Sequence, residues 1–193
     1  MQDGALFHRD RCCLVVIDVQ QYFLAKLPLD QRAPLVARIA WLMRVARALE
    51  IPIIATAEDI ANDGPCVPEL AALLPEGHSV FNKMVFGLYD QADIRAAVVA
   101  SGRDEFVLVG LETDVCIAHS ALGLAGAGHR VAVLEDACGS PPPHHEAGLE
   151  RLRQAAIVVT NVKGMHYEWV RDLATLAKLK TTIGGGLPPG LTL

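Results

Sequence analysis

The sequence is poor in features that define several large classes of protein. Its five cysteines form no Cys-x-x-Cys pair and no even-numbered set, so no disulfide framework is expected and the sequence indicates a reducing, cytoplasmic setting. The net charge of −5 leaves no basic surface for nucleic acid. No apolar run approaches the roughly 18 residues that span a bilayer. Neither nucleic acid nor a membrane is therefore expected as a partner.

Two further absences concern the start of the chain and its core. The opening residues MQDGALFHRD have neither the charged start nor the apolar stretch of a signal peptide, so none is expected. Aromatic residues make up only 5% of the chain, which predicts a core of aliphatic side chains and alanine. The length of 193 residues suits a single domain. We expect that domain over residues 1–183 and a flexible C-terminal tail over residues 184–193, where GGGLPPGLTL has the composition of a linker.

Short apolar runs alternate with segments of helical periodicity along the chain. The run CLVVID at residues 13–18 is uninterrupted, which is typical of a strand buried on both faces of a parallel sheet. Such alternation predicts right-handed strand–helix–strand crossovers, and so an α/β fold with a mainly parallel sheet between two layers of helices. The predicted strands cover residues 13–18, 51–56, 78–82, 106–109, 130–134 and 156–160. The predicted helices cover residues 33–49, 68–74, 90–101, 114–127, 143–155 and 166–179.

The stretch FVLVGLETDVCIAHSALGL, at residues 106–124, holds the first candidate for chemistry. An apolar run stops at Gly110, a short polar turn follows, and Cys116 lies at the start of the next predicted helix. The thiol would lie at the carboxyl edge of the sheet, where open α/β folds bind their ligands. Backbone N–H groups and the positive end of a helix dipole favour a thiolate there. A packing role explains an isolated cysteine equally well, so the interpretation depends on partners for the thiol.

Two charged residues are candidates for these partners. Asp18 ends the strand predicted at residues 13–18, and Lys83 follows the strand predicted at residues 78–82. Carboxyl ends of parallel strands meet at one edge, so both side chains should lie near Cys116. The thiol could attack a carbonyl carbon while the carboxylate takes its proton and later returns one to a leaving amine. The ammonium would stabilise the charged pair, and the combination indicates a nucleophilic enzyme.

Three motifs carry a family resemblance: LVVIDVQ at residues 14–20, NKxxF at residues 82–86 and VGLETDVCI at residues 109–117. They resemble the signatures of the isochorismatase-like cysteine hydrolases, a superfamily that includes nicotinamidases and N-carbamoylsarcosine amidases. The resemblance implies a six-stranded sheet, a homo-oligomer between dimer and octamer, and a catalytic triad of Asp18, Lys83 and Cys116. It also implies a cis peptide bond at Leu111–Glu112 and an oxyanion hole formed by the backbone N–H groups of Glu112 and Cys116.

The leading hypothesis is a metal-independent cysteine hydrolase that cleaves a C–N bond of a small amide or ureido-type substrate through a thioester. Nicotinamidases carry an Asp-x-His metal-binding motif after the second strand, whereas residues 56–62 here read TAEDIAN. No metal or other cofactor is therefore expected, and nicotinamide is disfavoured as the substrate. Three alternatives stay open: a vinyl-ether hydrolase using Asp18 as acid, a thiol sensor with Cys138 as resolving cysteine, and a catalytically silent assembly protein.

Other residues in these segments are weaker candidates. The predicted substrate contacts are Gln20, Phe23, Phe86 and Thr113. For Phe23 and Phe86, the wall of an apolar pocket and ordinary core packing are equally good explanations. Apart from Cys138 in the sensor alternative, no role is predicted for His119, Cys138 or the pair His144–His145.

Overall fold

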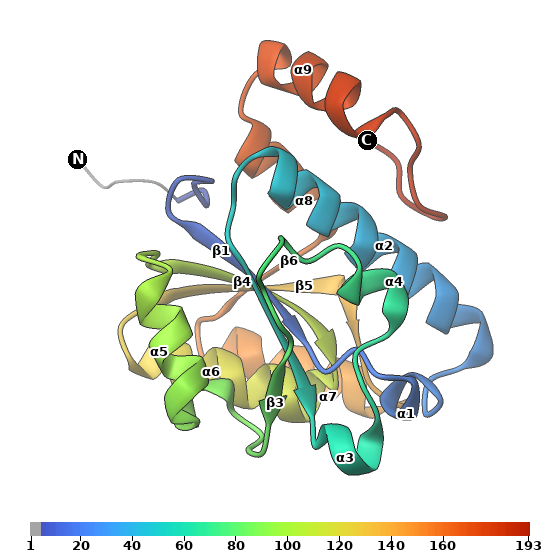
Figure 1. Cartoon of the computed structure of the whole chain (residues 1–193), viewed down its shortest axis with the longest axis vertical. Coiled ribbons are helices and arrows are strands. Elements are labelled where there is room, and N and C mark those ends of the chain that lie inside the picture. The colour runs from blue at the N-terminus through green and yellow to red at the C-terminus, as the bar shows by residue number, and fades with distance from the viewer. Residues whose placement is uncertain (1–4) are drawn as a thin grey trace.

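The computed structural model describes residues 5–193, and its centre is a six-stranded sheet lying between two layers of helices (Figure 1). The strand order is β3-β2-β1-β4-β5-β6, and each pair of neighbours is parallel. The strands are β1 (Cys12–Ile17), β2 (Ile53–Glu58), β3 (Phe81–Lys83), β4 (Glu105–Leu111), β5 (Arg130–Gly139) and β6 (Val158–Thr160). The predicted three-layer α/β fold with a six-stranded parallel sheet is confirmed.

The longer helices cover the two faces of the sheet (Figure 1). One face packs against α2 (Leu29–Ala48), α8 (Val162–Val170) and α9 (Leu173–Ile183). The other packs against α5 (Ala92–Ala100), α6 (Ala118–Gly126) and α7 (His144–Gln154). Connections contain the short helices α1 (Gln21–Leu24), α3 (Ile60–Asp63) and α4 (Pro68–Ala71), a 3-10 turn (Leu88–Asp90) and a π-helical turn (Thr113–Ile117).

The central strand β1 shows why an uninterrupted apolar run was the correct signal. Its side chains alternate between the faces, as they do in any strand. Leu14 and Val16 belong to the core under α2, whereas Val15 and Ile17 belong to the core under α5 to α7. Because β1 lies between β2 and β4, both faces and both edges are covered.

Several boundaries differ from the prediction. Strand β2 ends at Glu58, two residues beyond the predicted end. The helix predicted at residues 166–179 is two helices, because Arg171 adopts a φ of 68° and Asp172 then accepts a hydrogen bond from the Thr175 N–H at the start of α9. The helix predicted at residues 114–127 begins as the π-helical turn, and α6 follows it. Helix α2 begins four residues earlier than predicted and includes Pro34.

The last ten residues contain no helix or strand. Leu191 is nonetheless buried, and Leu193 packs against the core on the α2 side of the sheet. The flexibility of this tail and the domain boundary at residue 183 stay predictions. Among residues 5–193, no helix combines the length and the hydrophobicity that crossing a membrane requires.

Candidate active site

Asp18, Lys83 and Cys116 lie together at the carboxyl edge of the sheet. Asp18 follows β1, Lys83 ends β3, and Cys116 lies in the π-helical turn after β4. Lys83 Nζ is 2.9 Å from Asp18 Oδ2 and 3.7 Å from Cys116 Sγ. The first two residues are 0% exposed and Cys116 is 3% exposed. The fold therefore brings the three predicted residues into contact, and their catalytic roles stay predictions.

Close packing of the central strands shapes this edge. Gly110, near the end of β4, has a φ of 125°, and a Cβ atom there would overlap the carbonyl group of Ile17. Only glycine accepts both that dihedral angle and that approach. Directly after Ile17, Asp18 has a left-handed φ of 51°. The chain therefore turns sharply at Asp18.

Asp18 is a buried carboxylate held on both oxygens. Thr56 Oγ1 donates a hydrogen bond of 2.7 Å to Oδ1, and Lys83 pairs with Oδ2. Burial raises the pKa of Asp18 above its ordinary value because the ionised form loses hydration, and Lys83 and Thr56 offset part of that rise. A carboxylate with a raised pKa is a better proton acceptor than an ordinary aspartate.

Lys83 is the centre of the cluster. Its ammonium group contacts Asp18 Oδ2 at 2.9 Å and Glu58 Oε2 at 2.9 Å, and it donates to the Val85 carbonyl at 2.6 Å. Burial alone would lower the pKa of Lys83, but the negative charge of Asp18 and the hydrogen bonds with Glu58 and Asp18 act against burial, and the pKa is raised above its ordinary value. Lys83 is therefore a permanently charged, fully buried cation.

The Cys116 thiol lies beside two carboxylates. The sulfur donates a hydrogen bond of 3.1 Å to Glu58 Oε2. Burial raises the pKa of Cys116, the negative charge of Asp18 raises it further, and Lys83 offsets only part of the rise. Burial and the Asp18 carboxylate therefore oppose the expected effect of the helix start, and a thiolate at Cys116 stays a prediction. A neutral thiol that loses its proton to a neighbouring carboxylate during attack fits this environment.

Glu58 is the residue that the sequence analysis missed. Its carboxylate touches both Lys83 Nζ and Cys116 Sγ. The missed signal is its position, because Glu58 ends β2 at the same sheet edge where Asp18 and Lys83 were recognised. Ending the strand at Thr56 assigned Glu58 to a loop and hid this relation.

Gln20 positions Glu58. Its Nε2 donates to the Glu58 and Gly64 carbonyls, both at 2.7 Å, and its Oε1 accepts from the Glu58 N–H at 2.7 Å. Gln20 is 0% exposed. The amide group of Gln20 is thus committed to backbone groups on both sides, and its contact with the substrate stays a prediction.

The other predicted contacts lie in different environments. Phe23 is buried, with Lys26 Nζ 4.4 Å from its ring centroid. Thr113 is buried, and its Oγ1 is 2.8 Å from His145 Nδ1. Phe86 is 56% exposed and stands edge-on to the His119 ring. Their contacts with substrate stay predictions.

Two residues without a predicted role are now placed. Cys138 is buried beside Gly110 in the β4–β5 pairing, with its sulfur 3.8 Å from the Leu108 carbonyl oxygen. His144 begins α7.

The backbone around the nucleophile is tightly packed. The Leu111–Glu112 peptide bond is cis. A Cβ atom at Gly148 of α7 would lie 2.8 Å from the Asp114 backbone, so glycine lets α7 press against the π-helical turn. Ser140, which directly follows β5, donates a hydrogen bond of 2.7 Å to the Asp114 carboxylate. These contacts fix the turn, and the oxyanion hole at Glu112 and Cys116 stays a prediction.

The same cluster contains the atoms most able to bind a metal. Donor atoms of Asp18, Glu58 and Cys116 all lie within 4.8 Å of one another. Lys83 already supplies a positive charge 2.9 Å from each carboxylate. A metal ion would therefore compete with Lys83, and the absence of a metal from the reaction stays a prediction.

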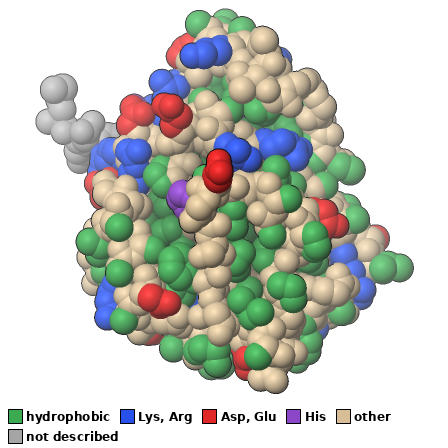
Figure 2. Space-filling model, viewed as in Figure 1, with side chains coloured by type: hydrophobic (Ala, Val, Ile, Leu, Met, Phe, Trp, Pro, Cys, Tyr) green, Lys and Arg blue, Asp and Glu red, His purple; other side chains and the backbone are tan. Residues whose placement is uncertain are grey.

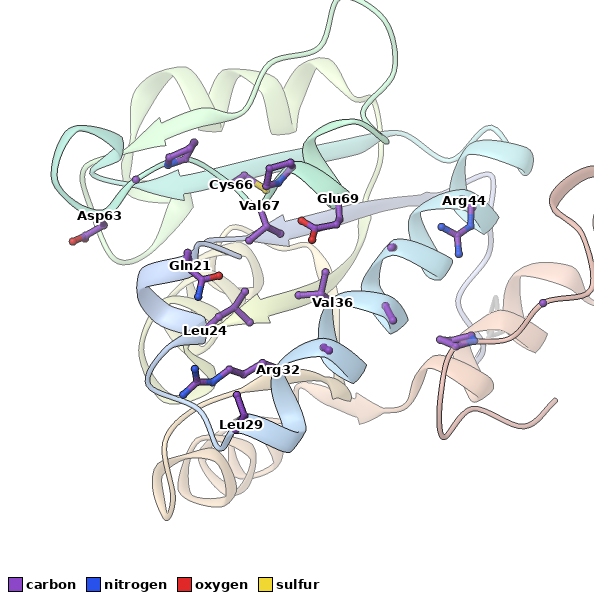
Figure 3. A pocket seen from close by; sticks show the side chains of 18 of the residues that line it. Gln21, Leu24, Leu29, Arg32, Val36, Arg44, Asp63, Cys66, Val67 and Glu69 are labelled. Atoms are coloured by element: carbon purple, nitrogen blue, oxygen red, sulfur yellow. The ribbon is translucent and has the colours of Figure 1, made fainter.

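A large cavity lies away from this cluster. It has a volume of about 1030 Å³ and lies between α1, α2, residues 63–69 and the C-terminal tail (Figure 3). Figure 3 shows Leu24, Leu29 and Val36 projecting toward it, with Arg32 and Arg44 on α2. None of Asp18, Lys83 and Cys116 lines it. We identify the site by its interacting charges rather than by cavity size.

Comparison with known proteins defines the class of protein. The family model described as the isochorismatase domain matches residues 12–163. The probable hydrolase YcaC of Escherichia coli is 31% identical over 70% of this chain and 68% of its own length. Isochorismatase domain-containing protein 2 of Bos taurus is 32% identical over 82% of this chain and 75% of its own length. This fold with its sheet-edge cluster is that of an isochorismatase-like hydrolase.

Solved structures agree with this assignment. YcaC from Pseudomonas aeruginosa, described with hexane-2,5-diol and covalent acrylamide, superposes with a TM-score of 0.86 at 25% identity, over 97% of this chain and 95% of its own. YcaC from Escherichia coli, described as an octameric hydrolase of unknown specificity, gives a TM-score of 0.82 at 25% identity, over 95% and 93% of the two chains. The protein belongs to the isochorismatase family and is a hydrolase.

Proposed function

We propose that this hydrolase is a metal-independent cysteine enzyme that cleaves a C–N bond of a small amide or ureido-type compound. The observation that carries the proposal is the buried contact of Asp18, Lys83 and Cys116 at one edge of the sheet. A thiol, a carboxylate of raised pKa and a buried cation are the groups that acyl transfer through a thioester requires.

In the proposed reaction, the Cys116 sulfur bonds to the carbonyl carbon while Asp18 accepts the thiol proton. The electron pair of the C=O bond moves to oxygen, where the N–H groups of Glu112 and Cys116 bind it. The C–N bond then breaks, and the nitrogen leaves with the proton from Asp18. Water attacks the thioester carbon and transfers a proton to Asp18. The C–S bond breaks, and the sulfur recovers that proton.

Mutation of the nucleophile tests the proposal. A panel of neutral amides and ureas is incubated with the protein, and product and intact protein mass are measured. We expect Cys116→Ala to abolish the acyl adduct and to lower turnover by about 10⁴-fold or more, as loss of a nucleophile does. The matched control Cys138→Ala removes another buried thiol and should keep both signals.

The outcomes separate the competing functions. Full turnover by Cys116→Ala would overturn the thioester route and favour proton transfer by Asp18 to a vinyl ether. Sulfenic or disulfide adducts without hydrolysis would favour a thiol sensor. No adduct and no turnover with any compound would favour an assembly protein.

We also propose that the chain forms a homo-oligomer. Support comes from the relative described as an octamer and from large exposed apolar side chains such as Leu29 and Leu173. Figure 2 shows hydrophobic side chains gathered in the middle of one face of the molecule. Contiguous exposed apolar surface of this kind marks interaction sites. Light scattering should give a mass that is a multiple of 20.7 kDa, and a monomer at micromolar concentration would contradict the proposal.

A further inference from the structure

Glu58 is held in place as firmly as the three predicted residues. The Gln20 side chain forms hydrogen bonds with the backbone N–H and the backbone carbonyl of Glu58, which fixes the backbone at this residue. Lys83 Nζ, at 2.9 Å, and Cys116 Sγ, at 3.1 Å, fix the carboxylate. With two hydrogen bonds on its backbone and two on its carboxylate, Glu58 exerts its field at a defined point of the site.

Glu58 is also the outermost member of the cluster. Its side chain is 18% exposed, whereas the side chains of Asp18 and Lys83 are 0% exposed. A reacting carbon must approach to roughly 3–3.5 Å from the nucleophilic atom. Since the Glu58 carboxylate is 3.1 Å from that sulfur, the groups attached to this carbon will lie beside the carboxylate.

The charges of the cluster do not cancel. Two carboxylates, Asp18 and Glu58, share the single ammonium group of Lys83, and burial raises the pKa of the thiol between them. Charged residues of the adjoining segments have partners of their own. Lys26 pairs with Glu112 at 3.3 Å, and Asp114 accepts a hydrogen bond from Ser140. With both carboxylates ionised, one negative charge of the cluster is left without a cation, and Glu58 is the more exposed of the two carboxylates.

We propose that Glu58 is the residue that sets the charge of the substrate: it repels anions and accepts N–H hydrogen bonds from an uncharged or cationic amide, ureido or guanidino compound. This inference rests on the proposed function and narrows its substrate class. Like charges facing each other at close range discriminate against wrong ligands. Carboxylates bind N–H groups strongly, most of all charged ones.

Two alkylating reagents that differ only in charge test the proposal without a known substrate. Iodoacetamide is neutral and iodoacetate is anionic, and both label the same sulfur. The rate of each reaction at Cys116 is followed by peptide mass spectrometry, which separates this thiol from the other four. The ratio of the two rates is compared with the ratio for the same cysteine in urea-unfolded protein. Any change in the pKa of the thiol cancels in this ratio.

We expect native Cys116 to prefer iodoacetamide by about tenfold or more beyond the unfolded reference, which is the scale of a unit charge roughly 4 Å away. Glu58→Gln keeps the size and the hydrogen-bond acceptor but removes the charge, and it should return the ratio to within about threefold of the unfolded value. Asp59→Asn is the matched control, since it removes the neighbouring carboxylate without touching the cluster and should leave the ratio unchanged.

A native ratio equal to the unfolded ratio would overturn the proposal, and this comparison uses only the wild-type protein if Glu58→Gln fails to fold. An unchanged ratio in a folded Glu58→Gln variant would overturn it as well. Neither result depends on turnover. An acyl adduct at Cys116 together with a flat ratio would leave the hydrolase mechanism standing and reject the role of Glu58. Full turnover by Cys116→Ala together with a selective ratio would reject the thioester mechanism and leave the role of Glu58 standing.

Discussion

Lys83 and His166 are both buried bases, but their pKa values are shifted in opposite directions. Lys83 is 0% exposed and His166 is 1% exposed. Lys83 contacts two carboxylates, and its pKa is raised. The ring nitrogens of His166 have no hydrogen-bond partner among residues 5–193, and burial lowers its pKa to about 4, with Lys180 adding to the effect. Burial neutralises a base unless acidic partners are buried with it.

The two environments correspond to two uses of the α/β fold. At the carboxyl edge of the sheet, the ends of β1, β2 and β3 and the turn after β4 bring four polar side chains together. The ammonium group of Lys83 can therefore stay charged. Between α2, α8 and α9, His166 borders a small cavity that Leu176, Leu179 and Lys180 also line, and the Trp41 ring centroid is 5.1 Å from the imidazole. The first environment keeps a buried base charged, whereas the second favours its neutral form.

The largest effect is expected from removing the paired cation. In Lys83→Met, the Asp18 and Glu58 carboxylates lose the ammonium group between them and face each other with little solvent. Breaking a buried ion pair from one side costs about 3–5 kcal/mol of unfolding free energy. We expect a loss of that size in urea denaturation at pH 7.5, together with loss of hydrolytic turnover.

Lys163→Met is the matched control for this measurement. Lys163 is exposed on α8, and surface substitutions of this kind change stability by about 0.5 kcal/mol or less. If Lys83→Met destabilised the protein no more than the control, Lys83 would not be the compensating charge of the cluster.

A smaller, pH-dependent effect is expected from His166. In the unfolded chain this histidine gains a proton below its ordinary pKa of 6.5, but in the folded protein it does so only near pH 4. The unfolded state therefore binds more protons between these values, so this contribution to stability is full above pH 6.5 and falls as the pH is lowered. Between pH 7.5 and pH 5, this contribution to the free energy of unfolding should fall by about 2 kcal/mol.

The variant His166→Phe should remove this dependence, because phenylalanine fills a similar volume and does not titrate. Its urea midpoint is compared with that of the wild type at pH 7.5 and pH 5. The difference between the two proteins should shift in favour of the variant at pH 5 by about 2 kcal/mol. If the stability difference between the two proteins were the same at both pH values, His166 would take up its proton at the same pH in the folded and the unfolded protein.

The predicted site residues came from one rule with a clear physical basis. Polar residues that follow apolar strand runs lie at the carboxyl edge of a parallel sheet, and Asp18, Lys83 and Cys116 were all found in this way. The same rule would have found Glu58 had β2 been ended two residues later. Strand ends are hard to place from sequence because Ala57 and Glu58 carry no signal that separates the last strand residue from the first loop residue.

The state of the Cys116 thiol could not be read from sequence. Proximity to a helix start favours a thiolate, but burial and the nearby carboxylates of Asp18 and Glu58 act in the opposite direction and raise the pKa of the thiol. Gln20 shows the same limit. A polar residue next to a catalytic candidate suggests a substrate contact, whereas the fold commits its amide to the backbone of Glu58 and Gly64.

The layers, the parallel sheet and three of the four members of the cluster follow from the sequence, because apolar runs and the polar residues that end them are local features. The folded structure adds that Glu58 joins them, that one ammonium group serves two carboxylates, and that burial and Asp18 raise the pKa of the thiol. These properties depend on distances between residues far apart in the chain and on how much water reaches them, and neither is written in any single segment.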